Sequence, residues 1–330
     1  MNKYLYIVFV FIFGCSLNPN SSFWTKTEKL KTDQAITKLL FEDVKPNEKE
    51  FNPNLKVNLP KINTKNINYN YNNDGFTSEK IIGNNFSKFK FSKIDNFSGF
   101  EPEILVDNQN LFFFDNKGSV IKFDKDSKVE WKKNYYSKSD KRNNPILFLA
   151  SEKNNLFVAD TNANYYLLNK ENGNLKWKKK HTSSFNSQIK IKNDKILVVD
   201  MENNLRCFSM KNGEILWTVP TQLTIVRSQK KQSLVIVSNL VIFSNSIGDL
   251  TAVDLNTGEL VWQTPTQALG LAKNITLRNS DVVSDGNLVF MSSNKNQFVA
   301  MNIKTGIIRW KQEINSELRP VVVSNYIVTI

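Results

Sequence analysis

The sequence predicts an all-β protein, a β-propeller of four-stranded antiparallel blades, and three observations support this fold class. Tryptophan recurs at a nearly constant distance, glycine usually stands four residues before it, and short apolar segments alternate with turn residues in between. The recurring tryptophans are 46, 40, 45 and 48 residues apart and are Trp131, Trp177, Trp217, Trp262 and Trp310. Periods of about 40 to 50 residues occur in solenoids, arrays and propellers, and the pattern inside one repeat distinguishes them.

The repeat that ends at Trp262 has the pattern of four strands. The segments SLVIVSN, LVIFSN, LTAVDL and ELVWQT are short and apolar, a turn is expected at Ser246 to Asp249, and NTG forms a three-residue turn before the last strand. Gly258 suits the left-handed position of such a hairpin loop. The glycines at the same place in other repeats are Gly173, Gly213 and Gly306. Four antiparallel strands per period form one propeller blade.

The tryptophan of each repeat is expected to dock against the neighbouring blade, because a ring on the last strand reaches that blade and buries roughly 150–250 Å². The repeat at Trp131 lacks the glycine and its turn, DKDSK, is one residue shorter, so this blade is degenerate. Its acidic residues Asp124 and Asp126 fit turn chemistry better than acid–base catalysis.

Five blades with their tryptophan cover about residues 101–314, and the propeller domain is predicted to span residues 61–330. A sixth blade begins at Leu318, and the sequence ends at Ile330, inside its second strand. A half blade leaves open strand edges, which natural sheets avoid. We therefore expect a sequence that is incomplete at its C-terminus, or a ring that closes in an atypical way. Residues 62–98 are a candidate for one more irregular strand pair.

The N-terminus has the pattern of a secretory signal peptide, predicted to span residues 1–14. One basic residue, Lys3, precedes an apolar run that is too short for a typical membrane span and ends at a small residue before Cys15. The segment IFGC resembles a bacterial lipobox, which implies that Cys15 is acylated and tethers the protein to a membrane. Ser16 at the next position implies the outer membrane, on its periplasmic face. The alternative is an ordinary signal peptide with an incidental cysteine.

Residues 15–60 are predicted to form a lipidated, polar tether that is punctuated by proline. Within this tether, TDQAITKLLFEDV has apolar residues at helical spacing, which predicts one short amphipathic helix before Pro46.

The composition argues against several classes of enzyme. The chain has two cysteines, Cys15 and Cys207, and one histidine, His181, which weakens zinc, Ser-His-Asp and Cys-His interpretations. We expect Cys207 to be a small buried core residue and His181 to be a solvated loop residue. The net charge of +13 suits a nucleic-acid or anionic-membrane surface, but it also fits a lysine-rich composition spread over loops. The second interpretation is favoured because the basic residues form no continuous stripe.

The pattern D-x-x-T-G-x-x-x-W, which occurs at Asp254, Thr257, Gly258 and Trp262, resembles the repeat of quinoprotein-like (PQQ-like) β-propellers. In one branch of that family, the quinoprotein dehydrogenases, a quinone and calcium lie in the central funnel. That branch carries acidic and amide calcium ligands, a tryptophan that stacks on the cofactor, and often a vicinal cysteine pair. This chain has no vicinal cysteines, and Trp24 is the one tryptophan outside the repeats. We therefore expect no cofactor, no metal site and no catalytic residues.

The other branch, the BamB lipoproteins of outer-membrane protein assembly, combines a lipobox with an eight-bladed propeller. The sequence resembles it in its lipobox, its short tether and the segment VNLPKIN before the blades. At this repeat length, eight blades imply roughly two to three more beyond Ile330. The resemblance implies a non-enzymatic scaffold that binds the periplasmic domains of a BamA-like protein and takes neither nucleic acid nor a small-molecule substrate. The alternative is a periplasmic quinoprotein-type enzyme or a ligand-binding propeller.

Two connections between blades carry the candidate residues for partner binding. BamB proteins use an L-x-L-R-like connection to contact BamA, and this resemblance points to Leu223, Ile225 and Arg227. Arg278 lies in the next connection, where the acidic residues of the family are largely missing. Exposed arginines with aliphatic neighbours are common interface anchors, although each could be a solvated loop residue.

Overall fold

The computed structural model describes residues 54, 56, 104–107, 110–221, 230–266, 277–323 and 325–330, and all of them belong to one compact unit, residues 44–330. The predicted signal peptide, Cys15, the short helix and the candidate strand pair at 62–98 lie outside the described residues. Among the described residues, no helix has the length and apolar character that a membrane crossing requires.

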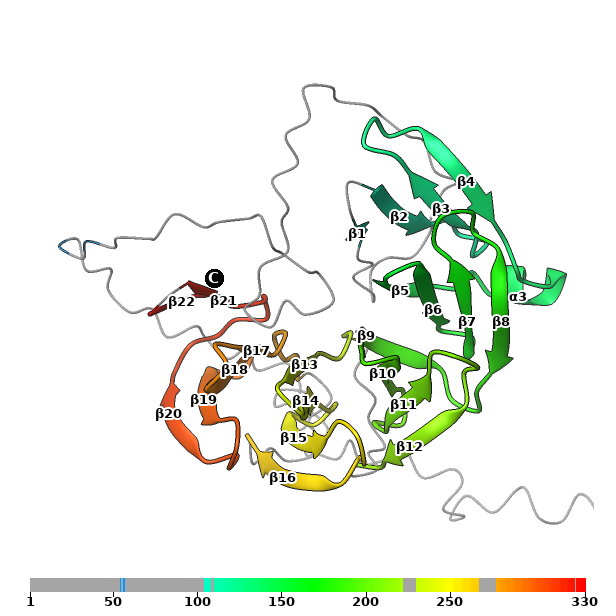
Figure 1. Cartoon of the computed structure of the whole chain (residues 1–330). Coiled ribbons are helices and arrows are strands. Elements are labelled where there is room, and N and C mark those ends of the chain that lie inside the picture. Colours follow the sequence, from blue (N-terminus) through cyan, green and yellow to red (C-terminus); the bar gives the residue numbers. More distant parts are fainter. Residues whose placement is uncertain are drawn as a thin grey trace, which may run out of the picture. The chain divides into compact units, whose positions relative to one another are not determined.

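The described residues form five four-stranded sheets, each with its strands in chain order, and one two-stranded sheet (Figure 1). Blade 1 contains β1 (Leu105–Asp107), β2 (Asn110–Phe114), β3 (Val120–Phe123) and β4 (Val129–Lys133). Blade 2 contains β5 (Leu147–Glu152), β6 (Asn155–Asp160), β7 (Asn164–Asn169) and β8 (Leu175–Lys180). Blade 3 contains β9 (Phe185–Lys192), β10 (Lys195–Asp200), β11 (Leu205–Ser209) and β12 (Ile215–Val219).

Blade 4 contains β13 (Leu234–Val237), β14 (Leu240–Ser244), β15 (Asp249–Asp254) and β16 (Leu260–Pro265). Blade 5 contains β17 (Val283–Ser284), β18 (Leu288–Ser293), β19 (Gln297–Asn302) and β20 (Ile308–Gln312). The last sheet pairs β21 (Val321–Val323) with β22 (Tyr326–Val328). The only helix among the described residues is α3 (Lys138–Arg142), between blades 1 and 2. The predicted fold class, an all-β propeller of four-stranded antiparallel blades, is confirmed.

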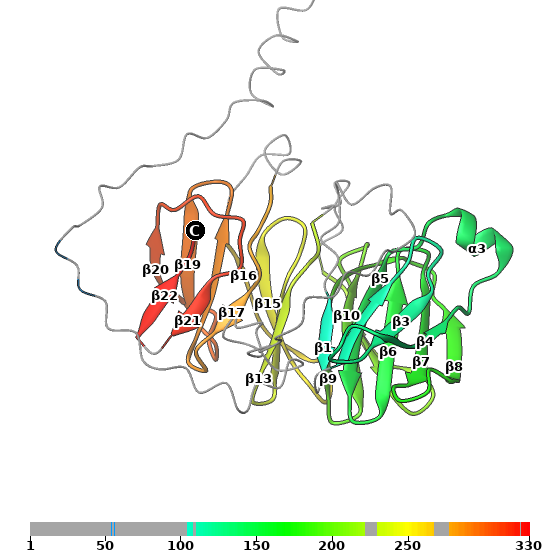
Figure 2. The same ribbon diagram turned by 90° about the horizontal axis from the view of Figure 1, so that it is seen from above.

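The first strand of each blade contacts the first strand of the next blade, and the fourth strand lies outermost (Figures 1 and 2). Apolar side chains fill the space between neighbouring blades: one cluster joins blades 2 and 3, and another joins blades 3 and 4. Cys207 is fully buried in the second of these clusters, as expected, and burial raises the pKa of its thiol to about 12. The core is therefore a series of apolar interfaces between neighbouring blades, which we call joints.

The turn between the third and fourth strands shares two features in all five blades, although the turn of blade 1 is one residue shorter. Strand register shifts by one residue at this turn, for example between Ala252 and Val253. The residue four before the tryptophan is left-handed, with Gly258 at φ 75°. In blade 1, Ser127 takes this conformation at φ 61°, so the shorter turn forms without glycine. There the carboxylate of Asp124 accepts the amides of Asp126 and Lys128, in agreement with the turn role expected for it.

Each of the first four tryptophans lies on the hairpin of the following blade. A Cβ atom at Gly258 would come within 2.7 Å of the ring of Trp217, and one at Gly306 within 2.6 Å of Trp262. Trp131 and Trp177 lie against Gly173 and Gly213 in the same way. Glycine is therefore required at this position for two reasons: the backbone is left-handed, and the tryptophan ring approaches too closely for a side chain.

The fifth tryptophan, Trp310, has a different environment. It packs against Phe290 and Phe298 of its own blade and against the apolar cluster that includes Val322 of the last sheet.

Candidate partner-binding rim

The connections between blades and the turns between second and third strands meet at one end of each blade, because the second strand of an antiparallel hairpin ends where the first begins. We call this the connection rim. Hydrogen bonds join its two components: Thr266 Oγ1 donates to the Gly248 carbonyl at 2.6 Å, and the Thr161 amide donates to the Ile146 carbonyl at 3.2 Å. The described ends of both predicted partner-binding connections belong to this rim.

A second repeated motif shapes the rim. The residue that begins each second-to-third-strand turn is a buried Asp, Asn or Ser whose side chain accepts the amide two residues on and, in the first four blades, also the amide four residues on. The residue three positions after it is left-handed in every blade. The residues that begin these turns are Asp115, Asp160, Asp200, Asn245 and Ser293. Such side-chain bonds hold a turn in one conformation, so the rim is presented on rigid turns.

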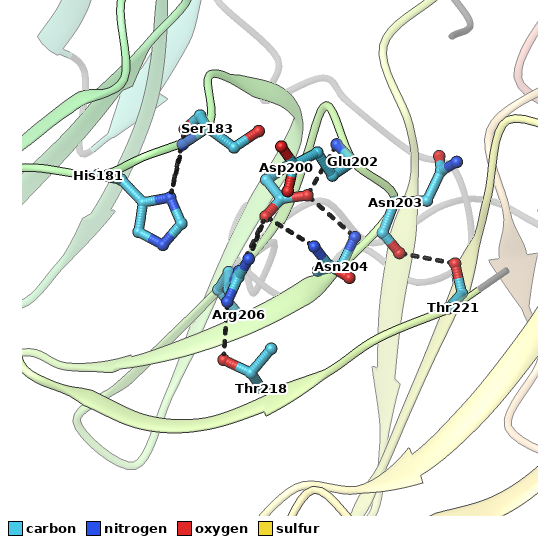
Figure 3. A network of polar contacts seen from close by, with 9 residues as sticks. All are labelled: His181, Ser183, Asp200, Glu202, Asn203, Asn204, Arg206, Thr218 and Thr221. Carbon is cyan, nitrogen blue, oxygen red and sulfur yellow. Dashed lines mark hydrogen bonds and ion pairs between the residues drawn. The ribbon is translucent and has the colours of Figure 1, made fainter. Parts of the chain in front are cut away.

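The turn of blade 3 carries an extended polar network (Figure 3). The fully buried carboxylate of Asp200 accepts the amides of Glu202 and Asn204 and pairs with Arg206 at 2.8 Å. Arg206 also donates to Thr218 Oγ1 on β12 at 3.1 Å. The arginine therefore neutralises the buried aspartate and ties its turn to the outer strand.

His181 is not the solvated loop residue that the sequence led us to expect. Its ring is half-buried against Phe185 and Phe208, with centroids 5.6 and 6.1 Å away, and its Nδ1 accepts the Ser183 amide at 3.1 Å (Figure 3). Burial and the positive charge of Arg206 lower the pKa of His181. The first residue after a strand can pack on the aromatic core of the next blade, and this contact was not visible in the local sequence.

Both ends of the connection between blades 3 and 4 are fixed on Asn203. Before the connection, Thr221 Oγ1 donates to the Asn203 carbonyl at 2.7 Å, and after it Gln232 Nε2 donates to Asn203 Oδ1 at 2.8 Å. Ser246 of blade 4 also donates to Asn203 Oδ1, from its amide and its hydroxyl. The candidate residues of this connection, Leu223, Ile225 and Arg227, lie outside the described residues.

Arg278 is described, and it lies between β16 and β17 as its place in the sequence predicted. Its backbone is held on the blade 5 turn, since its amide donates to Asn294 Oδ1 at 2.9 Å and its carbonyl accepts the Asn294 amide at 3.0 Å. Its side chain is 63% exposed, and the guanidinium lies 3.5 Å from the carboxylate of Glu317. Lys230 donates to the Glu317 carbonyl. The structure thus gathers the ends of three successive connections around Arg278.

A second polar cluster joins residues at or next to the first strands of several blades. Asp281 pairs with Arg319 and accepts Gln188 Nε2 at 2.9 Å, while Ser233 donates to Gln188 Oε1 at 3.0 Å. This carboxylate is therefore already held by an arginine and an amide. No group of three or more His, Cys, Asp or Glu side chains suited to a metal occurs among the described residues.

Sequence reasoning missed most of the residues that hold this rim. The missed residues form hydrogen bonds or ion pairs with residues far away in the chain, and they include Asn203, Glu317 and Asp281. For example, Gln188, which bonds to Asp281, lies 93 residues before it. One local signal was available: an Asp, Asn or Ser stands 17 residues before each of the last four tryptophans and 16 before Trp131.

Comparisons with known proteins agree with this architecture. A family model described as outer membrane protein assembly factor BamB matches residues 116–330. A search of curated proteins finds no match.

Three solved structures illustrate the likeness. BamB from Moraxella catarrhalis has a TM-score of 0.52 and 14% identity, over 68% of this chain and 65% of that one. The quinohemoprotein alcohol dehydrogenase ADHIIG from Pseudomonas putida HK5 has a TM-score of 0.52 and 14% identity, over 67% of this chain and 43% of that one. A europium-containing methanol dehydrogenase has a TM-score of 0.53 and 13% identity, over 65% and 51%. The chain spans less than two thirds of each, and these similarities show the fold alone.

Proposed function

Because this chain belongs to the family of the outer membrane protein assembly factor BamB, we propose that it is a non-enzymatic scaffold lipoprotein of outer-membrane β-barrel assembly. In this proposal, lipid on Cys15 holds the protein at the periplasmic face of the outer membrane. The connection rim binds the periplasmic domains of a BamA-like protein and assists the insertion of outer-membrane proteins.

The observation that supports this proposal best is the environment of Arg278. Its backbone is fixed by two hydrogen bonds to a rigid turn, whereas its guanidinium is exposed and lies at the limit of hydrogen-bond distance from Glu317. An arginine that is positioned but loosely paired can form a charge-assisted, bidentate bond with a partner carboxylate at little cost in ordering. Leu223, Ile225 and Arg227 in the neighbouring connection are proposed to complete the contact.

The test is a pull-down of the periplasmic domains of the cognate BamA-like protein. Arg278→Glu and Arg227→Glu should each weaken binding by roughly 2 kcal/mol, as expected for interface anchors. Arg309→Glu is the matched control, because Arg309 is exposed on the outer strand β20, away from the rim, and the charge change is the same. Full binding by both rim variants, with unchanged melting curves, would exclude the rim as the BamA contact.

A quinoprotein-type enzyme is the second candidate, because two of the similar structures are dehydrogenases. It predicts that pyrroloquinoline quinone with calcium raises the melting temperature and that the protein then absorbs as a quinoprotein. The scaffold proposal predicts no change in either measurement.

A further inference from the structure

The connection between blades 1 and 2 contains the helix α3 and is rich in positive charge. Lys138, Lys141 and Arg142 lie three and four residues apart on this helix, a spacing at which like charges repel each other. The one carboxylate of the connection, Asp140, is used within the helix, because it accepts the Ser137 hydroxyl at 2.8 Å and completes the N-terminal cap. The three cations therefore have no carboxylate of their own in this connection.

Contacts with both blades hold the start of this connection on the rim. On the side of blade 1, Asn134 Nδ2 donates to the Lys117 carbonyl at 2.9 Å, and a Cβ atom at Gly118 would lie 2.5 Å from the ring of Tyr136. On the side of blade 2, the hydroxyl of Tyr136 donates to the buried carboxylate of Asp160. The helix itself has no buried residue and projects from these two blades (Figures 1 and 2). The cations of α3 are thus presented to solvent from a fixed base.

Two neighbouring elements add further cations beside the helix. Lys117, in the turn of blade 1, and Lys180, at the end of β8, are both exposed. The pKa of Asp140 is lowered first by its bond from Ser137 and also by the positive charges of Lys178 and Lys180, which places this end of β8 close to α3. We call the following residues the basic cluster: Lys117, Lys138, Lys141, Arg142 and Lys180.

The basic cluster differs from the cations near the other connections, which are paired. Arg278 lies 3.5 Å from Glu317, and Arg319 pairs with Asp281. Within the described part of the chain, no member of the basic cluster forms an ion pair. Residues 134–146 and 176–182, all of which are described, expose no large apolar side chain either. A stable protein interface normally has an apolar or aromatic centre, so this surface suits anionic headgroups better than a folded protein.

We propose that the basic cluster binds the anionic headgroups of the membrane to which the protein is tethered. Lysine and arginine side chains next to an anionic bilayer each add to the attraction, and no shaped pocket is needed. The proposal rests on the lipid anchor of the proposed function, because that anchor keeps the cluster at a high effective concentration beside the bilayer. Docking through α3 fixes the orientation of the connection rim relative to the membrane, which a lipid on one residue does not do.

The test uses the full lipidated chain in two kinds of vesicle, phosphatidylcholine alone and phosphatidylcholine with phosphatidylglycerol in equal parts. A fluorophore on Ser139→Cys in α3 reports energy transfer to a dye at the headgroups, while Cys207 is buried and stays unlabelled. Transfer should be higher in the anionic vesicles, and high salt should abolish the difference. Lys138→Glu combined with Arg142→Glu should lower the ratio of docked to undocked protein about tenfold.

The matched control is Lys304→Glu with Arg309→Glu, which changes two exposed cations of blade 5 outside the connection rim and gives the same net charge. This control should dock like the original protein. Co-sedimentation with the neutral vesicles reports the lipid anchor separately. A chain that does not sediment with them lacks the anchor of the proposed function, and its binding to the anionic vesicles then tests the basic cluster alone.

Two results would overturn the proposal. One is equal energy transfer in both kinds of vesicle, or an equal loss in both double variants, because the membrane contact would then not depend on the basic cluster. The other is a Lys138 and Arg142 variant that docks normally on anionic vesicles but loses binding in the pull-down of the BamA-like domains. That result would assign the basic cluster to a protein partner.

Discussion

The joint between blades 3 and 4 and the joint between blades 4 and 5 share the same tryptophan and glycine, but their outer sides are held differently. At the second joint, Trp262 Nε1 donates to the Ile303 carbonyl at 2.9 Å, and Thr264 Oγ1 donates to the Gly306 carbonyl at 2.9 Å. At the first joint, Trp217 Nε1 is buried and has no hydrogen-bond partner in the described part of the chain. The repeat therefore determines where the ring lies, whereas the polar contacts around it are set blade by blade.

One part of the difference, the missing bond to the glycine carbonyl, follows from the lack of a suitably placed side-chain donor in blade 3. The bond to the glycine carbonyl comes from Thr264 in blade 4, two residues after the tryptophan, and from Tyr165 in blade 2, twelve residues before it. The corresponding residues of blade 3 are Val219 and Leu205, which are apolar and pack in the joint. Among the described residues, no side chain donates to the carbonyl of Gly258.

Polar contacts do hold the first joint at its connection end. Asn203 Oδ1 receives one bond from Gln232 and two from Ser246 of the next blade, and all three residues are buried. Blades 3 and 4 are therefore fixed near their connection and held mainly by apolar packing at their outer side.

Removing the two tryptophans should give the largest difference between the joints. Trp262→Ala removes a buried ring and its hydrogen bond, and we expect it to lower the free energy of unfolding by about 3–5 kcal/mol. Trp217 is partly exposed and has no bond to lose, so Trp217→Ala should cost less. Urea denaturation of both variants measures the difference. Equal losses would mean that packing alone determines the strength of both joints.

Adding a methyl group under each ring should give the next largest difference. Alanine at Gly258 or Gly306 is strained by the left-handed backbone, at about 1–3 kcal/mol, and its Cβ atom also meets the ring. Trp262 is held in place by its hydrogen bond, and Thr264 Oγ1 lies within 2.8 Å of the same Cβ atom. Trp217 has no hydrogen bond that holds its ring in this way. Gly306→Ala should therefore lower the midpoint of urea unfolding more than Gly258→Ala, and the reverse order would show that Trp217 is the more rigid ring.

The sequence could predict features that depend on residues close together in the chain, but not contacts between residues far apart in it. The spacing of tryptophan and glycine reports the hairpin within one blade, and it was sufficient for the fold class, the five complete blades and the left-handed Gly258. The pairing of Arg278 with Glu317 spans 39 residues and joins two connections, so no local sequence pattern predicts it. The unpaired Trp217 Nε1 could not be predicted either, because its repeat is as regular as that of Trp262.

The conservative change of tryptophan to phenylalanine isolates the hydrogen bond. Trp262→Phe leaves the Ile303 carbonyl without its donor and should cost about 1–2 kcal/mol more than Trp217→Phe. Trp217→Phe removes a buried N–H group that has no partner, which offsets part of the lost ring area. The two variants are compared by urea denaturation. A Trp217→Phe variant that is the less stable of the two would show that Trp217 Nε1 does form a bond.

The smallest effect, and the sharpest test of the comparison, comes from giving blade 3 the donor that it lacks. Val219→Thr keeps the shape of the side chain and places a hydroxyl where blade 4 has Thr264. If the hydroxyl reaches the Gly258 carbonyl, stability should rise by about 0.5–1.5 kcal/mol and amide exchange in the hairpin at 256–259 should slow. If it does not, a buried hydroxyl without a partner should lower stability by about 1–3 kcal/mol. The sign of the stability change therefore shows whether the hydroxyl bonds to the Gly258 carbonyl. The reciprocal variant, Thr264→Val, should speed amide exchange in the hairpin at 304–307. A loss of stability in Val219→Thr with unchanged exchange at 256–259 would show that the spacing of the two blades, and not the missing donor, leaves the outer side of this joint unbonded.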